Sequence, residues 1–331
     1  MSFEKIRYFA PSREEADAFP LPGDDSYVII PAKNEQDMIG LVLMELLQGI
    51  DANRIIVVDN STDKTARIAE EMGVVVVRKR HQLSRLRLDR LSQCFGLEFD
   101  STQVCVGKGA AFLASILYLE SIRAPEHARL FFLDADLRNL NEVNPLRYLN
   151  LADCKSGGNL ACVKLAHHNR ENELLLAFWN GARGQTSRYA SMNQLIWPLC
   201  GQAVVRFGTL KQLTLATGYS VETVMLMSLL DRFGPEALGQ VRIAVNLLDR
   251  PDSASKVMEM FCRIMDTAEV VLASGVPLHK LGHKAFRDLN RELRPREILF
   301  TTEDGPNCTK TVLPEKFIPP FQRLWEAGVV S

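Results

Sequence analysis

The segment LFFLDADLRN, residues 130–139, places four apolar residues directly before two aspartates, Asp134 and Asp136. An uninterrupted apolar run is typical of a strand that is buried on both faces of a parallel sheet. Residues two apart in extended chain point to the same side, and two carboxylates that close repel unless a cation lies between them. Because carboxylate oxygens suit Mg²⁺ or Mn²⁺, which often share substrate phosphates, the segment predicts a divalent metal held against a diphosphate. The alternative is a solvated turn at the end of the strand.

Segments of strand and helix character alternate around this one. The predicted strands are 27–32, 54–60, 73–77 and 128–136, and the predicted helices are 36–50, 61–73 and 107–122. A further helix is expected at 217–234, and the chain beyond residue 252 is expected to be helical to about 298 and then irregular. The alternation, with short connections, predicts an α/β fold in which helices flank a mostly parallel, doubly wound sheet.

Polar side chains follow three of the predicted strands where each strand ends. They are Lys33, Asn34 and Glu35 after the first strand, Asp59 after the second, and Asp134 and Asp136 after the fourth. Ligands bind outside the carboxyl ends of the strands in open parallel sheets, so we expect the site at this edge. The sequence GKG, residues 107–109, opens the third helix, where the helix N-terminus and Lys108 would attract an anion. The spacing of a Walker A loop is absent.

The bulk composition is that of an ordinary soluble globular protein, with 47% apolar and 24% charged residues in 331. A net charge of −1 gives no global field that would recruit nucleic acid, and we expect no nucleic-acid partner. No window approaches the roughly 18 apolar residues that a membrane-spanning helix needs. The seven cysteines are scattered, which favours reduced thiols and a cytoplasmic location.

Residues 78–100 interrupt the alternating pattern with a cluster of basic side chains. The segment reads RKRHQLSRLRLDRLSQCFGLEFD. Such a run is typical of a solvated helix face, of a mobile lid or of a patch that binds polyanions or a membrane surface. We favour the lid.

Two series of motifs resemble a known family. The series VIIPAKNE, VVDNSTDKT, GKGAAF and FFLDADL is similar to the nucleotide-sugar-binding half of GT-A (Rossmann-like) glycosyltransferases. The segments WPLCGQAVVRF and ATGYSVETVMLMSLLDRFGPEALGQVRIAV resemble the later half of glucosyl-3-phosphoglycerate synthases. Together they run from Tyr27 to Pro251, and their order and spacing support the resemblance more strongly than any single motif.

The resemblance implies roles for particular residues. It places Pro31, Ala32, Asn34 and Glu35 against uracil and ribose, and Asp59 against the base. It makes Lys108 and Asp134 donor-binding, Asp136 the metal-binding aspartate beside Asp134, and Glu222 a residue that faces the donor sugar. The catalytic set is then Glu222, Asp136 and Lys108. An acceptor motif, G-x-x-T, has a counterpart within 181–186, and the implied acceptor-binding residues are Arg183, Gly184, Thr186 and Arg188.

The chain also departs from the family pattern. Leu247 and Leu248 stand where the family supplies a metal-ligating histidine, and Asp249 and Asn246 are the candidates to replace it. Gln202 stands where a glutamate is usual. These departures bear on metal affinity, on the acceptor and on activity itself.

The resemblance implies a metal-dependent, retaining transfer of glucose from UDP-glucose to a small anionic acceptor such as 3-phosphoglycerate. Arg183, Arg188, Lys164, His167 and His168 are the residues that could hold an acceptor phosphate or carboxylate. Alternatives are GDP-mannose as donor, glycerate as acceptor, or a degenerate homologue that binds nucleotide without catalysis. On this interpretation residues 1–25 are a lead-in arm, 26–150 the donor half, 151–252 the acceptor half, and 253–331 a helical region for acceptor binding or oligomerisation. A homodimer is one arrangement that this last region allows.

Overall fold

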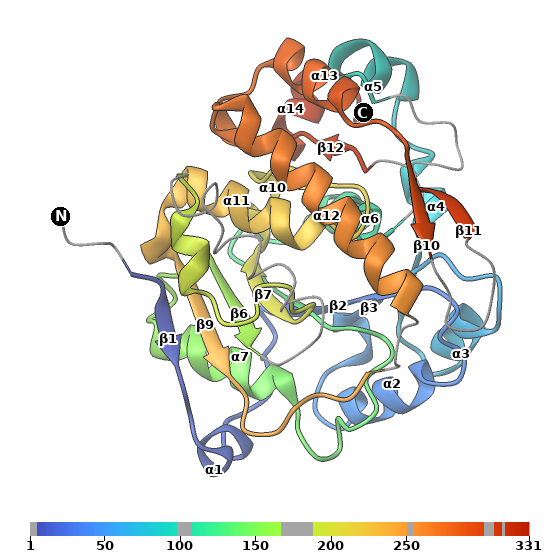
Figure 1. Ribbon diagram of the computed structural model, residues 1–331. Helices are drawn as coiled ribbons and strands as arrows, with labels where there is room; N and C mark the ends of the chain where they lie inside the picture. Colours follow the sequence, from blue (N-terminus) through green and yellow to red (C-terminus); the bar gives the residue numbers. More distant parts are fainter. Residues whose placement is uncertain are drawn as a thin grey trace.

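The computed structural model describes residues 5–97, 107–166, 188–249, 254–300, 308–312 and 315–330 (Figure 1). Its strands are β1 (Arg7–Phe9), β2 (Ser26–Ala32), β3 (Ile55–Asp59), β4 (Val75–Arg78), β5 (Arg129–Phe132), β6 (Cys162–Ala166), β7 (Ala203–Arg206), β8 (Leu215–Ala216), β9 (Leu238–Arg242), β10 (Arg296–Phe300), β11 (Cys308–Val312) and β12 (Phe317–Ile318). Eight of them form one sheet in the order β1-β9-β6-β7-β5-β2-β3-β4. Strand β7 runs antiparallel to both of its neighbours, and the other pairs are parallel. The predicted mostly parallel α/β sheet is confirmed.

Helices cover both faces of this sheet. They are α1 (Arg13–Asp17), α2 (Ile39–Leu47), α3 (Thr65–Glu71), α4 (Lys79–Leu83), α5 (Leu88–Phe95), α6 (Lys108–Ser121), α7 (Pro145–Lys155), α10 (Phe207–Lys211), α11 (Val221–Phe233), α12 (Ala254–Ser274), α13 (His283–Glu292) and α14 (Phe321–Glu326). Alternate residues of each central strand point to opposite faces, as in Tyr27 and Ile29 against Val28 and Ile30. One face packs on α2, α3 and α7, and the other shares a hydrophobic core with α6, α10 and α11. Helices α12 and α13 lie beyond this layer, with α12 against α11 and α13 against α5 (Figure 1).

The strand that carries the two aspartates is shorter than the sequence suggests. Strand β5 ends at Phe132, whereas the prediction extended it to Asp136. Asp134 and Asp136 therefore lie in the turn that follows the strand, and the expectation that extended chain aligns their side chains is wrong. The turn frees the two carboxylates to meet different partners.

Within residues 78–97, the apolar side chains of the basic segment belong to the core, while its basic side chains other than Lys79 are exposed. Helices α4 and α5 bury Leu83, Leu91 and Phe95, and the Phe95 ring lies edge-on to Phe286 of α13 at 6.2 Å between ring centroids. In Figure 1, α5 lies beside α13 although the two are far apart in the sequence. The lid interpretation is therefore wrong for residues 78–97; residues 98–100 lie outside the described part.

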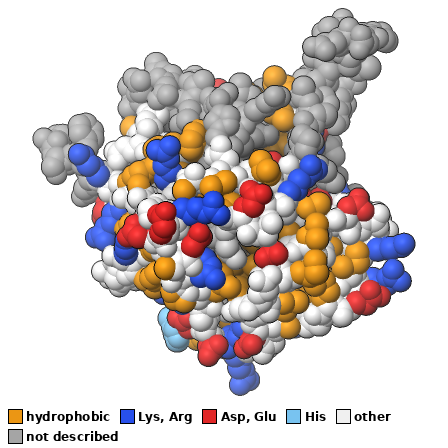
Figure 2. All heavy atoms as spheres, turned by 90° about the horizontal axis from the view of Figure 1, so that it is seen from below, with side chains coloured by type: hydrophobic (Ala, Val, Ile, Leu, Met, Phe, Trp, Pro, Cys, Tyr) orange, Lys and Arg blue, Asp and Glu red, His pale blue; other side chains and the backbone are white. Residues whose placement is uncertain are grey.

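Both ends of the chain add to the architecture. Strand β1 lies within the expected lead-in arm and extends the sheet beside β9. The region beyond residue 252 is helical, as predicted, but the part expected to be irregular forms the antiparallel pair β10–β11 and the strand β12, which pairs with β8. Among the described residues, no helix combines the length and apolarity needed to cross a membrane. The face seen in Figure 2 carries basic and acidic side chains interspersed.

Candidate functional site

The topology of the sheet gathers the predicted residues at one edge. Strands β2, β3, β4 and β5 are mutually parallel, so the residues that follow each of them emerge on the same side. Because β7 runs the opposite way beside β5, it is the amino end of β7, with Gln202, that reaches this edge. The register sets Ala32 opposite Asp59 and Asp59 opposite Arg78.

A lysine lies at the centre of the cluster. Lys108, the first residue of α6, donates from Nζ to Asp134 Oδ1 at 2.6 Å and to Glu222 Oε1 at 2.9 Å. All three side chains are largely buried, with 18%, 30% and 11% of their surface exposed. Burial alone would lower the pKa of Lys108, but the charges of Asp134 and Glu222 outweigh it and hold that pKa well above its ordinary value. The three groups therefore form a charged unit in which the lysine stays protonated.

Gln202 is a further partner of Asp134. Its Nε2 donates to Asp134 Oδ2 at 2.8 Å, while its Oε1 accepts from the Cys200 thiol at 2.9 Å. The buried Lys164 in turn donates to the Cys200 carbonyl at 2.6 Å. Lys164 is thus a buried residue whose ammonium group supports the chain beside β7. Burial also raises the pKa of Cys200 to about 12, so this thiol remains a donor at neutral pH.

Two glycines are required by the close packing around Lys108. A Cβ on Gly201 would lie 2.1 Å from Asp134 Oδ2 and 2.5 Å from Lys108 Nζ. A Cβ on Gly109 would lie 1.6 Å from the Ala216 carbonyl oxygen. The N–H groups of Gly109 and Ala110 donate to the carbonyls of Gly218 and Thr217 at 3.2 and 3.0 Å. The expectation that the first amides of this helix receive an anion is therefore wrong for these two, and the positive charge here comes from Lys108.

Asp136 lies in a different electrostatic setting from Asp134. Burial, followed by the charges of Asp134 and Asp249, raises the pKa of Asp136. A carboxylate destabilised by neighbouring carboxylates fits a divalent cation, because a cation removes both the repulsion and the penalty of burial. Within the described ranges, no group of three or more His, Cys, Asp or Glu side chains is arranged to hold a metal ion.

The segment after β9 is tied to the loop after Asp136. Asn139 donates from Nδ2 to the Asn246 carbonyl at 3.0 Å and accepts at Oδ1 from the Leu248 N–H at 2.8 Å. The Leu248 carbonyl accepts from the Arg138 N–H at 2.7 Å. These bonds hold Asp249 close enough to perturb Asp136, while the Leu248 side chain is 55% exposed. Of the two replacements considered for the histidine, Asp249 is the one whose charge acts on Asp136.

The loops after β2 and β3 are braced against one another by Asn34. This residue has a left-handed backbone, with φ of 59°, a conformation that asparagine tolerates better than most side chains. Its N–H donates to Ser61 Oγ at 2.8 Å, and its Oδ1 accepts from the Thr62 N–H at 2.9 Å. The neighbouring Glu35 N–H donates to Thr65 Oγ1 at 2.8 Å. Pro31 and Ala32, the last two residues of β2, thus lead into a fixed loop.

Asp59 is held by a residue that the sequence interpretation missed. The Asp59 side chain is 3% exposed; Oδ1 accepts from the Ser61 N–H at 3.1 Å, and Oδ2 accepts from Arg78 at 3.1 Å. Arg78 also contacts Glu70 at 2.7 Å. A signal was present, since Arg78 directly follows the predicted third strand and parallel neighbours end at the same edge.

The predicted acceptor residues are only partly described. Arg183, Gly184, Thr186, His167 and His168 lie outside the described residues. Arg188 donates to Asp231 Oδ1 at 3.0 Å, and its guanidinium also contacts Tyr189 Oη at 2.8 Å. Asp231 and Glu222 lie at opposite ends of α11, about 13 Å apart along the helix axis. The structure therefore places Arg188 away from the Lys108 cluster.

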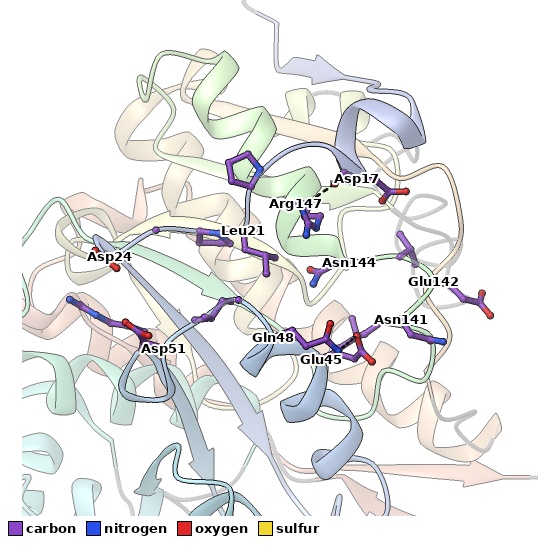
Figure 3. Close-up of a pocket in the computed structure, with 18 of the residues that line it drawn as sticks. Asp17, Leu21, Asp24, Glu45, Gln48, Asp51, Asn141, Glu142, Asn144 and Arg147 are labelled. Atoms are coloured by element: carbon purple, nitrogen blue, oxygen red, sulfur yellow. Dashed lines mark hydrogen bonds between the residues drawn. The ribbon is translucent and has the colours of Figure 1, made fainter.

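A cavity of about 700 Å³ lies elsewhere, between α2 and the segment that leads into α7 (Figure 3). Asp24, Glu45, Asp51, Glu142 and Arg147 are among the residues that line it. Arg147 donates to the carbonyls of Asp17 and Phe19, and Arg13 donates to the Glu142 carbonyl, so these arginines serve the fold. None of the predicted site residues lines this cavity, and we assign the site by its chemistry at the sheet edge.

The mostly parallel sheet, the inserted antiparallel strand and the acidic carboxyl edge define the class: the chain has the GT-A fold of nucleotide-sugar glycosyltransferases. The family model for Glycosyl transferase family 2 matches residues 27–96, which run from β2 to α5. The predicted resemblance to this class is thereby confirmed.

The chain is similar to two solved structures of one enzyme and, over a short segment, to one curated protein sequence. Glucosyl-3-phosphoglycerate synthase from Mycobacterium tuberculosis, in complex with Mn²⁺, UDP and phosphoglyceric acid, has a TM-score of 0.66 and 20% identity over 97% of this chain and 99% of that one. Its complex with Mn²⁺, UDP-glucose and glycerol 3-phosphate gives a TM-score of 0.66 and 20% identity over 96% and 99%. Uncharacterized protein MJ1222 of Methanocaldococcus jannaschii is 44% identical over 62 residues, 19% of this chain and 25% of that protein. The match thus spans a quarter of the length of that curated relative.

Proposed function

We propose that the chain is a metal-dependent glycosyltransferase that moves glucose from UDP-glucose to a small phosphorylated acceptor, with 3-phosphoglycerate favoured. The observation that carries the proposal is the Lys108–Asp134–Glu222 unit beside Asp136, at the sheet edge where this fold class binds its donor. The family match over residues 27–96 supports the donor half.

The donor would lie along the braced loops. Pro31, Ala32, Asn34 and Glu35 would contact uracil and ribose, and Asp59 would contact the base. Ala32 and Asp59 are register partners in adjacent strands, so the two contact sites form one continuous surface. This placement orients the diphosphate toward Asp136 and Lys108.

Asp136, with Asp249, would hold Mg²⁺ or Mn²⁺ against the diphosphate. A divalent ion bound there would offset the negative charge that grows on the departing diphosphate. The related synthase is described with Mn²⁺ and UDP, and also with Mg²⁺ and UDP. Asp134 would act differently, because its carboxylate already binds Lys108 and Gln202.

Lys108 and Glu222 would act on the bond that breaks. As the glycosidic bond to the β-phosphate lengthens, Lys108 supplies a fixed positive charge in a largely buried setting, where such a charge stabilises the transition state most. Glu222, which accepts a hydrogen bond from Lys108, would face the donor sugar and set its orientation. The acceptor hydroxyl oxygen would bond to the anomeric carbon as the bond to the β-phosphate oxygen breaks, and its proton would pass to the departing diphosphate. We propose retention of the anomeric configuration, as the resemblance implies.

We propose a small phosphorylated molecule as the acceptor. The related synthase is described with phosphoglyceric acid and with glycerol 3-phosphate, which favours a small phosphorylated acceptor over glycerate. We propose that the division into a donor half, 26–150, and an acceptor half, 151–252, reflects these two substrates. The scattered cysteines favour the cytoplasm as the site of action, and none of the comparisons supports a homodimer.

A second candidate is a homologue that binds nucleotide without catalysis. It is favoured by Leu248, an exposed apolar side chain at the position where the family supplies a metal-ligating histidine. A thermal-shift screen of UDP-glucose, GDP-mannose and UDP with Mg²⁺ or Mn²⁺ tests donor binding, since a specific ligand raises the melting temperature by linkage. We expect a metal-dependent rise with UDP-glucose and UDP. A rise with GDP-mannose alone would contradict the proposed donor, and no rise with any nucleotide would contradict both candidates.

A further inference from the structure

A buried carboxylate from the C-terminal part of the chain binds the start of the helix that carries Glu222. Glu315 is 2% exposed, and its Oε1 and Oε2 accept from the backbone N–H groups of Tyr219 and Ser220, each at 2.7 Å. These two residues directly precede α11, whose second residue is Glu222. Ser220 is the N-cap residue of α11 and Tyr219 precedes it, so Glu315 binds the N–H groups at the entrance to the helix, which have no partner within the helix.

The same segment holds the whole loop before α11. We call residues 315–318 the C-terminal clamp. Its strand β12 pairs with β8, with Phe317 opposite Ala216 and Ile318 opposite Leu215. The Thr217 N–H donates to the Lys316 carbonyl at 2.9 Å, and the Lys316 N–H donates to Thr217 Oγ1 at 3.0 Å. The loop 215–220 is therefore bonded to the clamp along its length.

The loop connects the clamp to the two helices that carry Lys108 and Glu222. On one side it leads into α11 and Glu222. On the other side the carbonyls of Thr217 and Gly218 accept from the first N–H groups of α6, the helix that begins with Lys108. Gly218 is required here, because a Cβ on it would lie 2.1 Å from Glu315 Oε1. The clamp thus fixes a loop that touches the base of Lys108 and the base of Glu222 together.

We propose that Glu315 is a positioning residue: its carboxylate fixes the start of α11 so that Glu222 meets Lys108 in the geometry that transfer requires. This inference rests on the proposed function. Glu315 acts through Glu222 and does not contact a substrate. Since displacing a reacting group by about 1 Å can lower a rate by roughly 100-fold, loss of the cap should reduce kcat far more than it alters donor binding.

The test compares Glu315→Gln with a matched control, Asp231→Asn. Asp231 is a carboxylate near the other end of α11; its side chain is 2% exposed and it accepts from the Leu278 N–H at 2.6 Å. Both variants keep side-chain size and remove one charge. We expect Glu315→Gln to lower kcat roughly 10- to 100-fold with KM for the donor within about threefold, and Asp231→Asn to leave kcat within about threefold. Equal kcat losses in the two variants, or native kcat in a folded Glu315→Gln, would overturn the proposal.

A double mutant separates positioning from general stability. In the Glu222→Gln background the loss caused by Glu315→Gln should disappear, because the cap then has no catalytic group to position. A full, additive loss in that background would contradict the inference. Hydrogen exchange at the Tyr219 and Ser220 amides requires no turnover and should accelerate at least tenfold in Glu315→Gln; unchanged exchange would refute the contact. If the native chain turns over no nucleotide sugar, the proposed function is refuted. The hydrogen-exchange measurement would then still test whether Glu315 binds the Tyr219 and Ser220 amides.

Discussion

Lys108 and Asp134 form an ion pair of 2.6 Å that joins the start of α6 to the turn after β5. This ion pair gives the two aspartates of the sequence DAD, residues 134–136, different surroundings. Asp134 is committed to the lysine and to Gln202, whereas Asp136 lies near Asp249 and has a raised pKa. We therefore propose that the two aspartates differ in role, Asp134 as a partner of Lys108 and Asp136 as the candidate metal ligand.

Removing the lysine charge should impair both stability and catalysis. In Lys108→Met, Asp134 and Glu222 lose their shared donor and remain largely buried, so we expect a loss of about 1–3 kcal/mol in the free energy of unfolding. Turnover should fall by roughly 100-fold or more, as for other fixed charges at a leaving group. Urea denaturation and initial rates measure the two effects. Lys108→Arg keeps the charge, and an equal loss of turnover in that variant would show that geometry, not charge, is the limiting factor.

The two aspartates should respond differently to the same substitution. Asp136→Asn removes the proposed ligand, so calorimetric titration of UDP with Mn²⁺ should lose its metal dependence. Asp134→Asn removes a partner of Lys108 but should retain metal-dependent UDP binding. Identical metal dependence in Asp136→Asn and in the native chain would refute the assignment.

Leu248 offers a gain-of-function test. Its side chain is 55% exposed, so a histidine there should not disturb the core. We expect Leu248→His to tighten Mn²⁺ binding in the absence of nucleotide, because it restores the family's nitrogen ligand beside Asp136. In the native chain, metal binding should be weak alone and markedly tightened by UDP. The buried neighbour Leu247 provides the control, since Leu247→His should destabilise the fold without improving affinity.

The raised pKa of Asp136 predicts a pH dependence. Burial first, and then Asp134 and Asp249, raise it above the ordinary 3.8. The folded state therefore binds this proton more tightly than the unfolded chain, and the associated stability, present below pH 3.8, is lost as the pH rises through the folded-state pKa. Metal affinity should follow the opposite trend and increase as the pH rises, because deprotonation of Asp136 provides the carboxylate that binds the cation. Asp249→Asn should move the transition to lower pH, and Mn²⁺ titrations in UDP across the range would measure it. A transition that stays in place would exclude the influence of Asp249.

Much of the sheet and its acidic edge could be predicted from local patterns. The apolar run before Asp134 and the alternation of strands and helices depend on neighbours in sequence, and the edge follows from parallel pairing. Gln202 could not be assigned a partner, because its place depends on β7 running antiparallel beside β5. The C-terminal clamp could not be predicted either. Glu315 binds Tyr219 across 96 positions of the sequence, and no local periodicity indicates such a contact. The basic segment was interpreted as a lid because charged residues dominate its composition, and its buried leucines lie between them in the sequence.

The central claim is tested most directly by release of UDP from UDP-glucose in the presence of Mn²⁺ and 3-phosphoglycerate. The native chain and Asp136→Asn should be measured side by side, with and without the acceptor. We predict acceptor-dependent UDP release by the native chain, with a glucosylated product of matching amount, and a loss of roughly 100-fold or more in Asp136→Asn. Release that is equal in the two chains, or metal-dependent UDP binding with no turnover on 3-phosphoglycerate, glycerol 3-phosphate or glycerate, would contradict the account.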